Sequence, residues 1–206
     1  MTVQPVSLNL LGPLLHVIGG RVAMVDGDGR GWPGSELADL LQSLCAGAEA
    51  AGLAPGHRVA LILPDHPATA VAILGLSERL SVLPLNNALT QAEQAEILVQ
   101  AGVDAVIALP QDAAAAALAQ VAGALFLSFA PETGMLRATG ALPAPTIARP
   151  AGLVLLTSGS TGTPRAGAAA GGSALAFRTD NRADAGAVAN RSRGPCLADV
   201  SCRRAG

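Results

Sequence analysis

The sequence predicts an α/β fold built on a doubly wound, mostly parallel sheet. Helical segments alternate along the chain with short apolar segments of strand length, and this alternation is typical of sheets that are covered by helices. Half of the 206 residues are hydrophobic but only 2% are aromatic. We therefore expect one domain with a core of Leu, Val, Ile and Ala.

The first elements predicted are a strand, a hairpin-type turn and a long helix. Residues 21–25 form a short strand, and the Asp-Gly-Asp-Gly run at 26–29 is typical of a hairpin turn. Ser35 has the side chain of an N-cap residue. Leucines then recur at helical spacing until a helix end near Gly52. These leucines are Leu37, Leu40, Leu41 and Leu44.

Two further strands flank the next helix. After the Pro-Gly turn at 55–56, residues 58–63 are a mostly apolar run, which predicts a buried strand. Residues 68–80 predict an apolar helix, and residues 81–85 predict another strand. A strand, a helix and a strand in this order are typical of a parallel sheet.

Capping signals place the helix that follows. Thr90 and Glu93 have the spacing of a capping box. Gly102 lies where a C-terminal glycine closes a helix that runs to about Ala101. The next segments predict strands at 105–109 and 124–127, a helix at 112–122 between them, and a surface loop rich in proline and glycine at 129–150.

The last predicted strand, at 153–156, leads into a run rich in hydroxyl side chains and glycine. Glycines let a backbone turn tightly and approach a ligand closely, while hydroxyls, amides and one cationic side chain suit a polyphosphate. A flexible linker is the alternative, and the run lacks the GxxxxGK spacing of a Walker loop. The candidate phosphate-binding residues are Thr157, Ser158, Gly159, Ser160, Thr161, Gly162, Thr163, Pro164 and Arg165.

This run resembles the phosphate loop of the adenylate-forming enzymes, the AMP-dependent synthetases and ligases that include acyl-CoA synthetases. Their usual form is (S/T)SG(S/T)TGxPK, and Arg165 stands where Lys is usual. Residues 53–67 and 82–108 resemble the stretches that precede the loop in that family. The resemblance implies that residues 1–165 are a partial AMP-binding domain, the truncated N-terminal part of the family's fold.

The resemblance also implies an activity and its cofactors. An ATP-dependent acyl-CoA ligase of this family activates a carboxylate as an acyl-adenylate, with ATP and Mg²⁺, and transfers it to coenzyme A. The family's adenylation lysine has no counterpart, because the chain contains no lysine. We therefore expect this fragment to be inactive and assign no catalytic residue. The alternative is a non-enzymatic module that binds nucleotide phosphates or a partner.

Composition and charge restrict the class of protein further. A net charge of −2 argues against a nucleic-acid surface. The uncharged window at 113–130 reaches the length of a membrane span, but we interpret it as a helix followed by a strand. No signal peptide is visible, and three cysteines without metal or redox spacing fit a cytoplasmic location. The sequence leaves the oligomeric state, the acid substrate and the acceptor open.

Residues 166–206 differ in character from the rest of the chain. They have no useful periodicity and contain many arginines and two of the three cysteines. One interpretation is a disordered extension. The other is an out-of-frame tail, because residues 197–203 read one base later permit Leu-Pro-Met-Phe-His-Ala, which resembles a family motif downstream of the phosphate loop.

Isolated residues outside the loop are given structural interpretations. His57 is expected on the surface in a turn, and His66 at a helix entry. Asp26 and Asp28 are interpreted as turn residues and not as a metal pair. Two more side chains are assigned to packing: Trp32 at the edge of the core and Cys45 as a buried thiol.

Overall fold

The computed structural model describes residues 10–145, 147–157 and 165–170. The described elements belong to one compact unit, residues 1–176. Its helices are α1 (Leu11–Ile18), α2 (Gly34–Ala50), α3 (Pro67–Ser77), α4 (Gln91–Ala101) and α5 (Ala113–Val121). Its strands are β1 (Val22–Val25), β2 (Gly31–Pro33), β3 (Arg58–Ile62), β4 (Ser81–Pro84), β5 (Ala105–Ala108), β6 (Leu125–Ala130), β7 (Met135–Ala138), β8 (Gly152–Thr157) and β9 (Arg165–Ala170).

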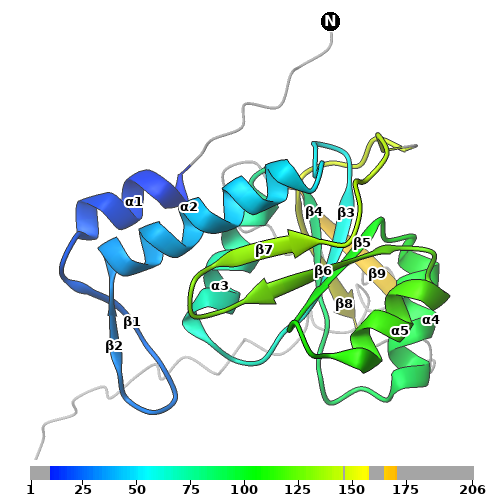
Figure 1. Ribbon diagram of the computed structural model, residues 1–206, viewed down its shortest axis with the longest axis horizontal. Coiled ribbons are helices and arrows are strands. Elements are labelled where there is room, and N and C mark those ends of the chain that lie inside the picture. The colour runs from blue at the N-terminus through cyan, green and yellow to red at the C-terminus, as the bar shows by residue number, and fades with distance from the viewer. Residues whose placement is uncertain (1–9, 146, 158–164, 171–206) are drawn as a thin grey trace, which may run out of the picture. The chain divides into compact units, whose positions relative to one another are not determined.

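The strands form a large sheet and a separate hairpin (Figure 1). The large sheet has the order β7-β6-β5-β3-β4-β8-β9. Its five inner strands run parallel, while β7 and β9 run antiparallel to β6 and β8. β1 and β2 pair antiparallel around the predicted Asp-Gly turn. The predicted α/β class with a mostly parallel sheet is confirmed.

Two apolar cores cover the two faces of the sheet. Val59 and Leu61 of β3 pack on one face with α2 and α3. Ala60 and Ile62 pack on the other face with α4 and α5, which lie side by side in Figure 1. Because successive strand side chains point to opposite faces, a strand that is buried on both faces must be apolar throughout. This requirement explains the continuous apolar runs in the sequence.

The predicted capping signals of α4 are confirmed. The Thr90 side chain accepts a hydrogen bond from Glu93 N, and the Glu93 side chain accepts one from Thr90 N. Gly102 ends the helix in the left-handed conformation, with φ 59. The uncharged window at 113–130 divides into α5 and β6 as expected. Among the described helices, none combines the length and apolarity that crossing a membrane requires.

Two local predictions are wrong. Ser35 does not cap α2, which begins at Gly34 after Pro33 without a side-chain cap. A side chain at position 34 would lie 2.7 Å from Ile18 Cβ, so close packing against α1, which the sequence analysis missed, sets this helix start. The segment 129–150 is not a surface loop throughout, because β6 continues to Ala130 and β7 pairs with it. Its buried side chains, Phe129 and Leu136, are 1% and 4% exposed.

Candidate functional site

The carboxyl-terminal edge of the parallel strands is where this topology places a ligand. β3 leads into α3 on one face of the sheet, and its neighbour β4 leads into α4 on the other face. At the carboxyl-terminal edge of the sheet, the loop after β3 therefore turns toward one face and the loop after β4 turns toward the other. In open α/β sheets, ligands bind beyond the carboxyl ends of the strands at such a switch point.

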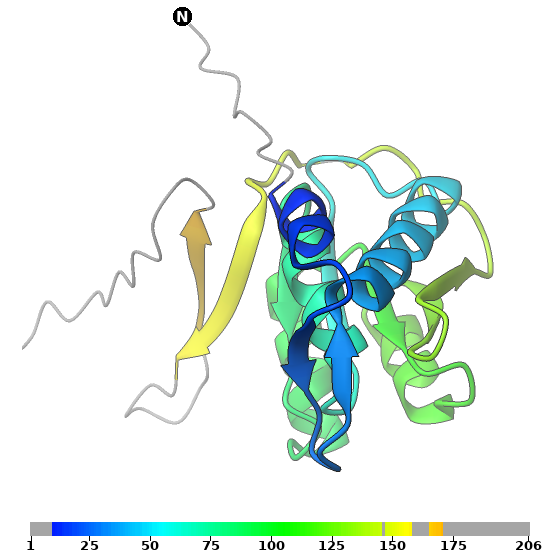
Figure 2. The ribbon, with the colours of Figure 1, turned by 90° about the vertical axis from the view of Figure 1, so that its left-hand side faces the viewer.

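β8 lies next to β4 and ends at that edge. Its parallel ladder with β4 contains two register pairs, Ser81 with Gly152 and Val82 with Leu153. Val154 is 2% exposed, whereas Leu155 is 40% exposed. The remaining length of β8 is held by β9, and Figure 2 shows the two strands side by side. The carboxyl-terminal half of β8 thus depends on β9 for its backbone pairing.

The register of this ladder brings together the two ends of the predicted phosphate loop. Thr157 and Arg165 are partners across the antiparallel pair, and Cα atoms of such partners lie about 4.5–5.5 Å apart. Thr157 is also the last residue of β8. The intervening candidates lie outside the described residues: Ser158, Gly159, Ser160, Thr161, Gly162, Thr163 and Pro164.

One asparagine side chain and one asparagine backbone carbonyl connect the segment after β4 to its neighbours. Asn87 Nδ2 donates to Leu63 O at 2.9 Å, which ties the loop after β4 to the loop after β3. Gln94, 7% exposed, donates from Nε2 to Asn86 O at 3.3 Å. These contacts were not expected from the sequence. Their signal is the pair of asparagines directly after an apolar strand, because polar side chains at carboxyl ends of strands gather at one edge.

The β1–β2 hairpin and the loop after β3 enclose an open hollow of about 370 Å³. His66 lines this hollow and caps α3, because its Nδ1 accepts a hydrogen bond from Ala68 N at 3.1 Å. The predicted role of His66 at a helix entry is therefore confirmed.

The buried Trp32 packs edge-on against His66, with ring centroids 5.0 Å apart, and its Nε1 donates to Asp26 Oδ2 at 2.9 Å. The turn role of Asp26 is also confirmed, because its other oxygen accepts from Asp28 N and Arg30 N.

The hydrogen bond from Trp32 is the main cause that lowers the pKa of the Asp26 carboxyl. The backbone N–H groups of the turn and the charge of Arg30 act in the same direction. The guanidinium of Arg30 also stacks 3.9 Å from the Trp32 ring centroid. These contacts keep Asp26 ionised as part of the turn, and they occupy both of its oxygens.

The surface position expected for His57 is wrong. The residue is 1% exposed. Its Nδ1 accepts from Ala54 N at 3.0 Å, so the neutral ring carries its proton on Nε2, which lies 2.9 Å from Pro143 O. The segment that covers His57 is 86 residues away in sequence. A sequence pattern around His57 could not reveal this burial.

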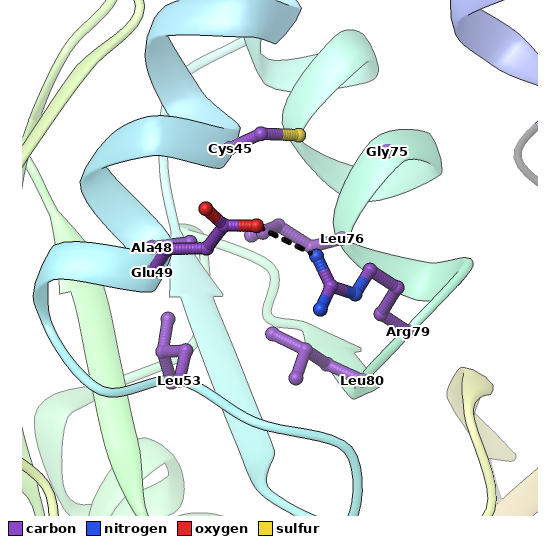
Figure 3. A pocket seen from close by; sticks show the side chains of 8 residues that line it. All are labelled: Cys45, Ala48, Glu49, Leu53, Gly75, Leu76, Arg79 and Leu80. Atoms are coloured by element: carbon purple, nitrogen blue, oxygen red, sulfur yellow. Dashed lines mark hydrogen bonds and ion pairs between the residues drawn. The ribbon is translucent and has the colours of Figure 1, made fainter.

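Cys45 faces a small cavity of about 20 Å³ between α2 and α3, shown in Figure 3. The side chain is half-buried, and burial raises the pKa of its thiol. An ion pair of 3.0 Å between Arg79 Nη1 and Glu49 Oε1 borders this cavity. A volume of this size accommodates about one water molecule. The cavity therefore offers no room for a nucleotide.

Comparison with solved structures shows the same fold in three enzymes. MatB from Rhodopseudomonas palustris is 24% identical, with a TM-score of 0.60, over 79% of this chain and 34% of that protein. The amide bond synthetase McbA from Marinactinospora thermotolerans is 24% identical, with a TM-score of 0.57, over 77% and 34%. A benzoate CoA ligase from Burkholderia xenovorans LB400 is 22% identical, with a TM-score of 0.54, over 76% and 32%.

These likenesses establish the fold. This chain spans about a third of the length of each of the three proteins. A comparison with curated proteins found no match. A profile of the AMP-binding enzyme family matches residues 17–180, which is most of the chain. The chain belongs to the AMP-binding enzyme family.

Proposed function

We propose that this chain is the N-terminal, phosphate-binding part of an adenylate-forming ligase. The observation that carries the proposal is the pairing of Thr157 with Arg165 at the carboxyl end of β8, next to the topological switch point. In this pairing the two ends of the candidate run meet at the edge where α/β sheets bind nucleotides. The family match and an ATP-bound structure of MatB with a TM-score of 0.59 support ATP as the nucleotide.

In this proposal the loop grips the β- and γ-phosphates and helps to place the α-phosphate for attack by a carboxylate. Catalysis at phosphorus depends on positioning and on neutralising charge. Gly159 and Gly162 permit close approach, and Arg165 supplies a fixed charge in place of the usual lysine. Arg is a planar fork and not a point charge, so the contact is retuned. The proposed hydroxyl donors are Thr157, Ser158, Ser160, Thr161 and Thr163, with Thr161 also near Mg²⁺.

In the complete ligase reaction a carboxylate would attack the α-phosphate of ATP and release pyrophosphate, which gives an acyl-adenylate. The thiol of coenzyme A would then take the acyl group and release AMP. An amine acceptor is the competing possibility, because the solved relatives include an amide bond synthetase as well as a CoA ligase. We propose that these 206 residues bind nucleotide without completing adenylation, since they contain no lysine. We also place the chain in the cytoplasm. We propose that residues 166–206 are an aberrant, out-of-frame tail, of which residues 166–170 still pair with β8 as part of β9 and residues up to 180 still match the family.

A non-enzymatic nucleotide-phosphate-binding module is the alternative proposal. Both proposals predict binding of ATP, so a hydroxylamine trap for acyl-adenylates separates them. The ligase proposal predicts trapped product when this chain is joined to the remaining two-thirds of a relative such as MatB. A binding module predicts affinity for ATP without any trapped product in that chimera.

Calorimetric titration with Mg²⁺–ATP tests phosphate binding directly. We expect saturable binding by the 206-residue chain, and loss of about tenfold or more in affinity for Gly159→Val, because about 1.4 kcal/mol of lost contact is a factor of ten. Gly20→Val is the matched control, since a side-chain carbon on Gly20 would meet nothing within 4 Å. A folded chain that shows no saturable binding, or equal losses in the two variants, would contradict the proposal.

A further inference from the structure

The segment that joins β7 to β8 must cross the sheet from one side to the other. In the strand order, β6, β5, β3 and β4 lie between its two ends. At about 4.8 Å between neighbouring strands, this distance is about 24 Å. Residues 139–151 reach about 43 Å when fully extended, so the crossover segment, as we call residues 139–151, has ample slack. Its described residues form no helix or strand, and specific contacts must therefore fix its course.

The first half of the crossover segment is fixed to the turn that precedes β3. Leu142 N donates to Ala51 O at 3.2 Å, and His57 Nε2 donates to Pro143 O at 2.9 Å. A side-chain carbon on Gly56, whose φ is 103, would lie 3.1 Å from Pro145 Cγ. The backbone of the turn and the crossover segment therefore pack closely, with His57 buried between them.

The second half is fixed to the amino-terminal edge of the parallel strands. Arg149 Nη1 forms an ion pair of 2.7 Å with Asp104 Oδ2, and Arg149 Nη2 donates to Gly102 O at 2.8 Å. The same Asp104 oxygen accepts from Arg58 N at 2.7 Å. The side chains of Arg149 and Asp104 are only 15% and 24% exposed. Removal of one partner from a pair with so little exposure leaves the other charge poorly solvated.

Arg58 adds a second guanidinium to this cluster. Its Nη1 donates to Ala101 O at 2.6 Å, and its Nε donates to Ser81 Oγ at 3.1 Å. Burial, followed by the nearby charge of Arg149, lowers the pKa of Arg58, while Asp104 opposes this shift. One carboxylate thus balances two arginines where β3, β4 and β5 begin.

We propose that Arg149, held by Asp104 and assisted by His57, is a positioning residue that sets the register of β8 against β4. Arg149 lies three residues before β8, and Gly152 N then donates to Leu80 O at 2.9 Å. Only two register pairs join β8 to β4. The contact at Arg149 therefore helps to fix the residue at which β8 begins. It thereby also fixes the position of Thr157 at the end of the strand.

The cost of losing this register follows from strand geometry. A slip of one residue turns every side chain to the opposite face, so Val154, which is 2% exposed, would leave its core. The same slip moves the end of β8 by about 3.3 Å, which is enough to pull apart a donor and an acceptor that were in hydrogen-bond contact. Arg149 would thus act on nucleotide binding without touching the nucleotide.

Amide hydrogen exchange of the 206-residue chain tests the register directly. In Arg149→Met we expect the amides of β8 to exchange about tenfold faster or more, a factor worth about 1.4 kcal/mol, while those of β5 stay unchanged. Arg79→Met is the matched control, because it removes an ion pair of 3.0 Å at side chains that are 51% and 64% exposed. If Arg149→Met does not fold, Arg149→Lys, which keeps the charge but loses the fork, should show the same effect at smaller size.

A second measurement connects the register to the proposed function, on which the ligand part of the inference rests. We expect Arg149→Met to raise the Kd for Mg²⁺–ATP about tenfold while Arg79→Met leaves it unchanged, under conditions where both variants are fully folded. If the unmodified chain does not bind ATP, the proposed function fails, but faster exchange confined to β8 still supports the role of Arg149. Equal acceleration in β5 and β8, or none in either strand, would overturn it.

Discussion

Two glycines share a left-handed backbone but differ in what surrounds them. Gly134 turns the chain between β6 and β7 with φ 68, and Gly123 follows α5 with φ 66. A side-chain carbon on Gly134 would overlap Leu40 O of α2 and would lie 2.8 Å from Leu40 Cα. The same atom on Gly123 would have nothing within 4 Å. Substitution of each by alanine therefore separates the cost of the conformation from the cost of the contact.

The magnitudes follow from these two terms. A left-handed conformation costs a residue with a side chain about 1–2 kcal/mol, and both variants bear this cost. Overpacking adds about 1–3 kcal/mol, and it applies only to Gly134→Ala. The atoms that a new methyl group would meet belong to the backbone of α2, so rotation of a side chain cannot relieve the overlap. We expect a loss of about 2–5 kcal/mol for Gly134→Ala and about 1–2 kcal/mol for Gly123→Ala.

Urea denaturation followed by circular dichroism measures both losses. The midpoint should fall further for Gly134→Ala, with an unchanged slope in each variant, because the surface exposed on unfolding stays the same. Equal losses would show that the turn between β6 and β7 does not pack against α2. The contact between α2 and the β6–β7 turn would then be refuted.

Two further predictions concern pH and the tail. Hydrogen bonds from the Thr90 side chain and then from Thr90 N lower the pKa of Glu93, so its contribution to stability is present above the unfolded-state value and is lost as pH falls through the lowered value. The unfolding free energy of the unmodified chain should therefore fall more steeply below about pH 4.3 than that of Glu93→Gln, and parallel curves would contradict this. Resequencing of the DNA that encodes residues 165–206 should reveal a second frame that resembles the family motif, and a clean frame without one would refute the out-of-frame tail.

Residue types and their spacing were enough to predict the features whose physical causes are local. The capping box of Thr90 and Glu93 and the left-handed Gly102 each act within a single helical turn, so a short stretch of sequence contains all that places them. The apolar runs of the inner strands also predict those strands, because both faces of such strands are buried. The phosphate loop stays a prediction from the same kind of local spacing, and the structure adds that Thr157 and Arg165, the two ends of the run, are paired.

Features whose partners lie far away in sequence emerged only from the folded chain. β7 exists as a strand because β6 offers it an edge and α2 covers it. His57 is buried because Pro143, 86 residues later, lies over it, and Arg149 meets Asp104 across 45 residues. The path of the crossover segment determines these contacts. No local sequence pattern predicts this path, because the crossover segment is longer than the distance it spans and could reach β8 by many routes.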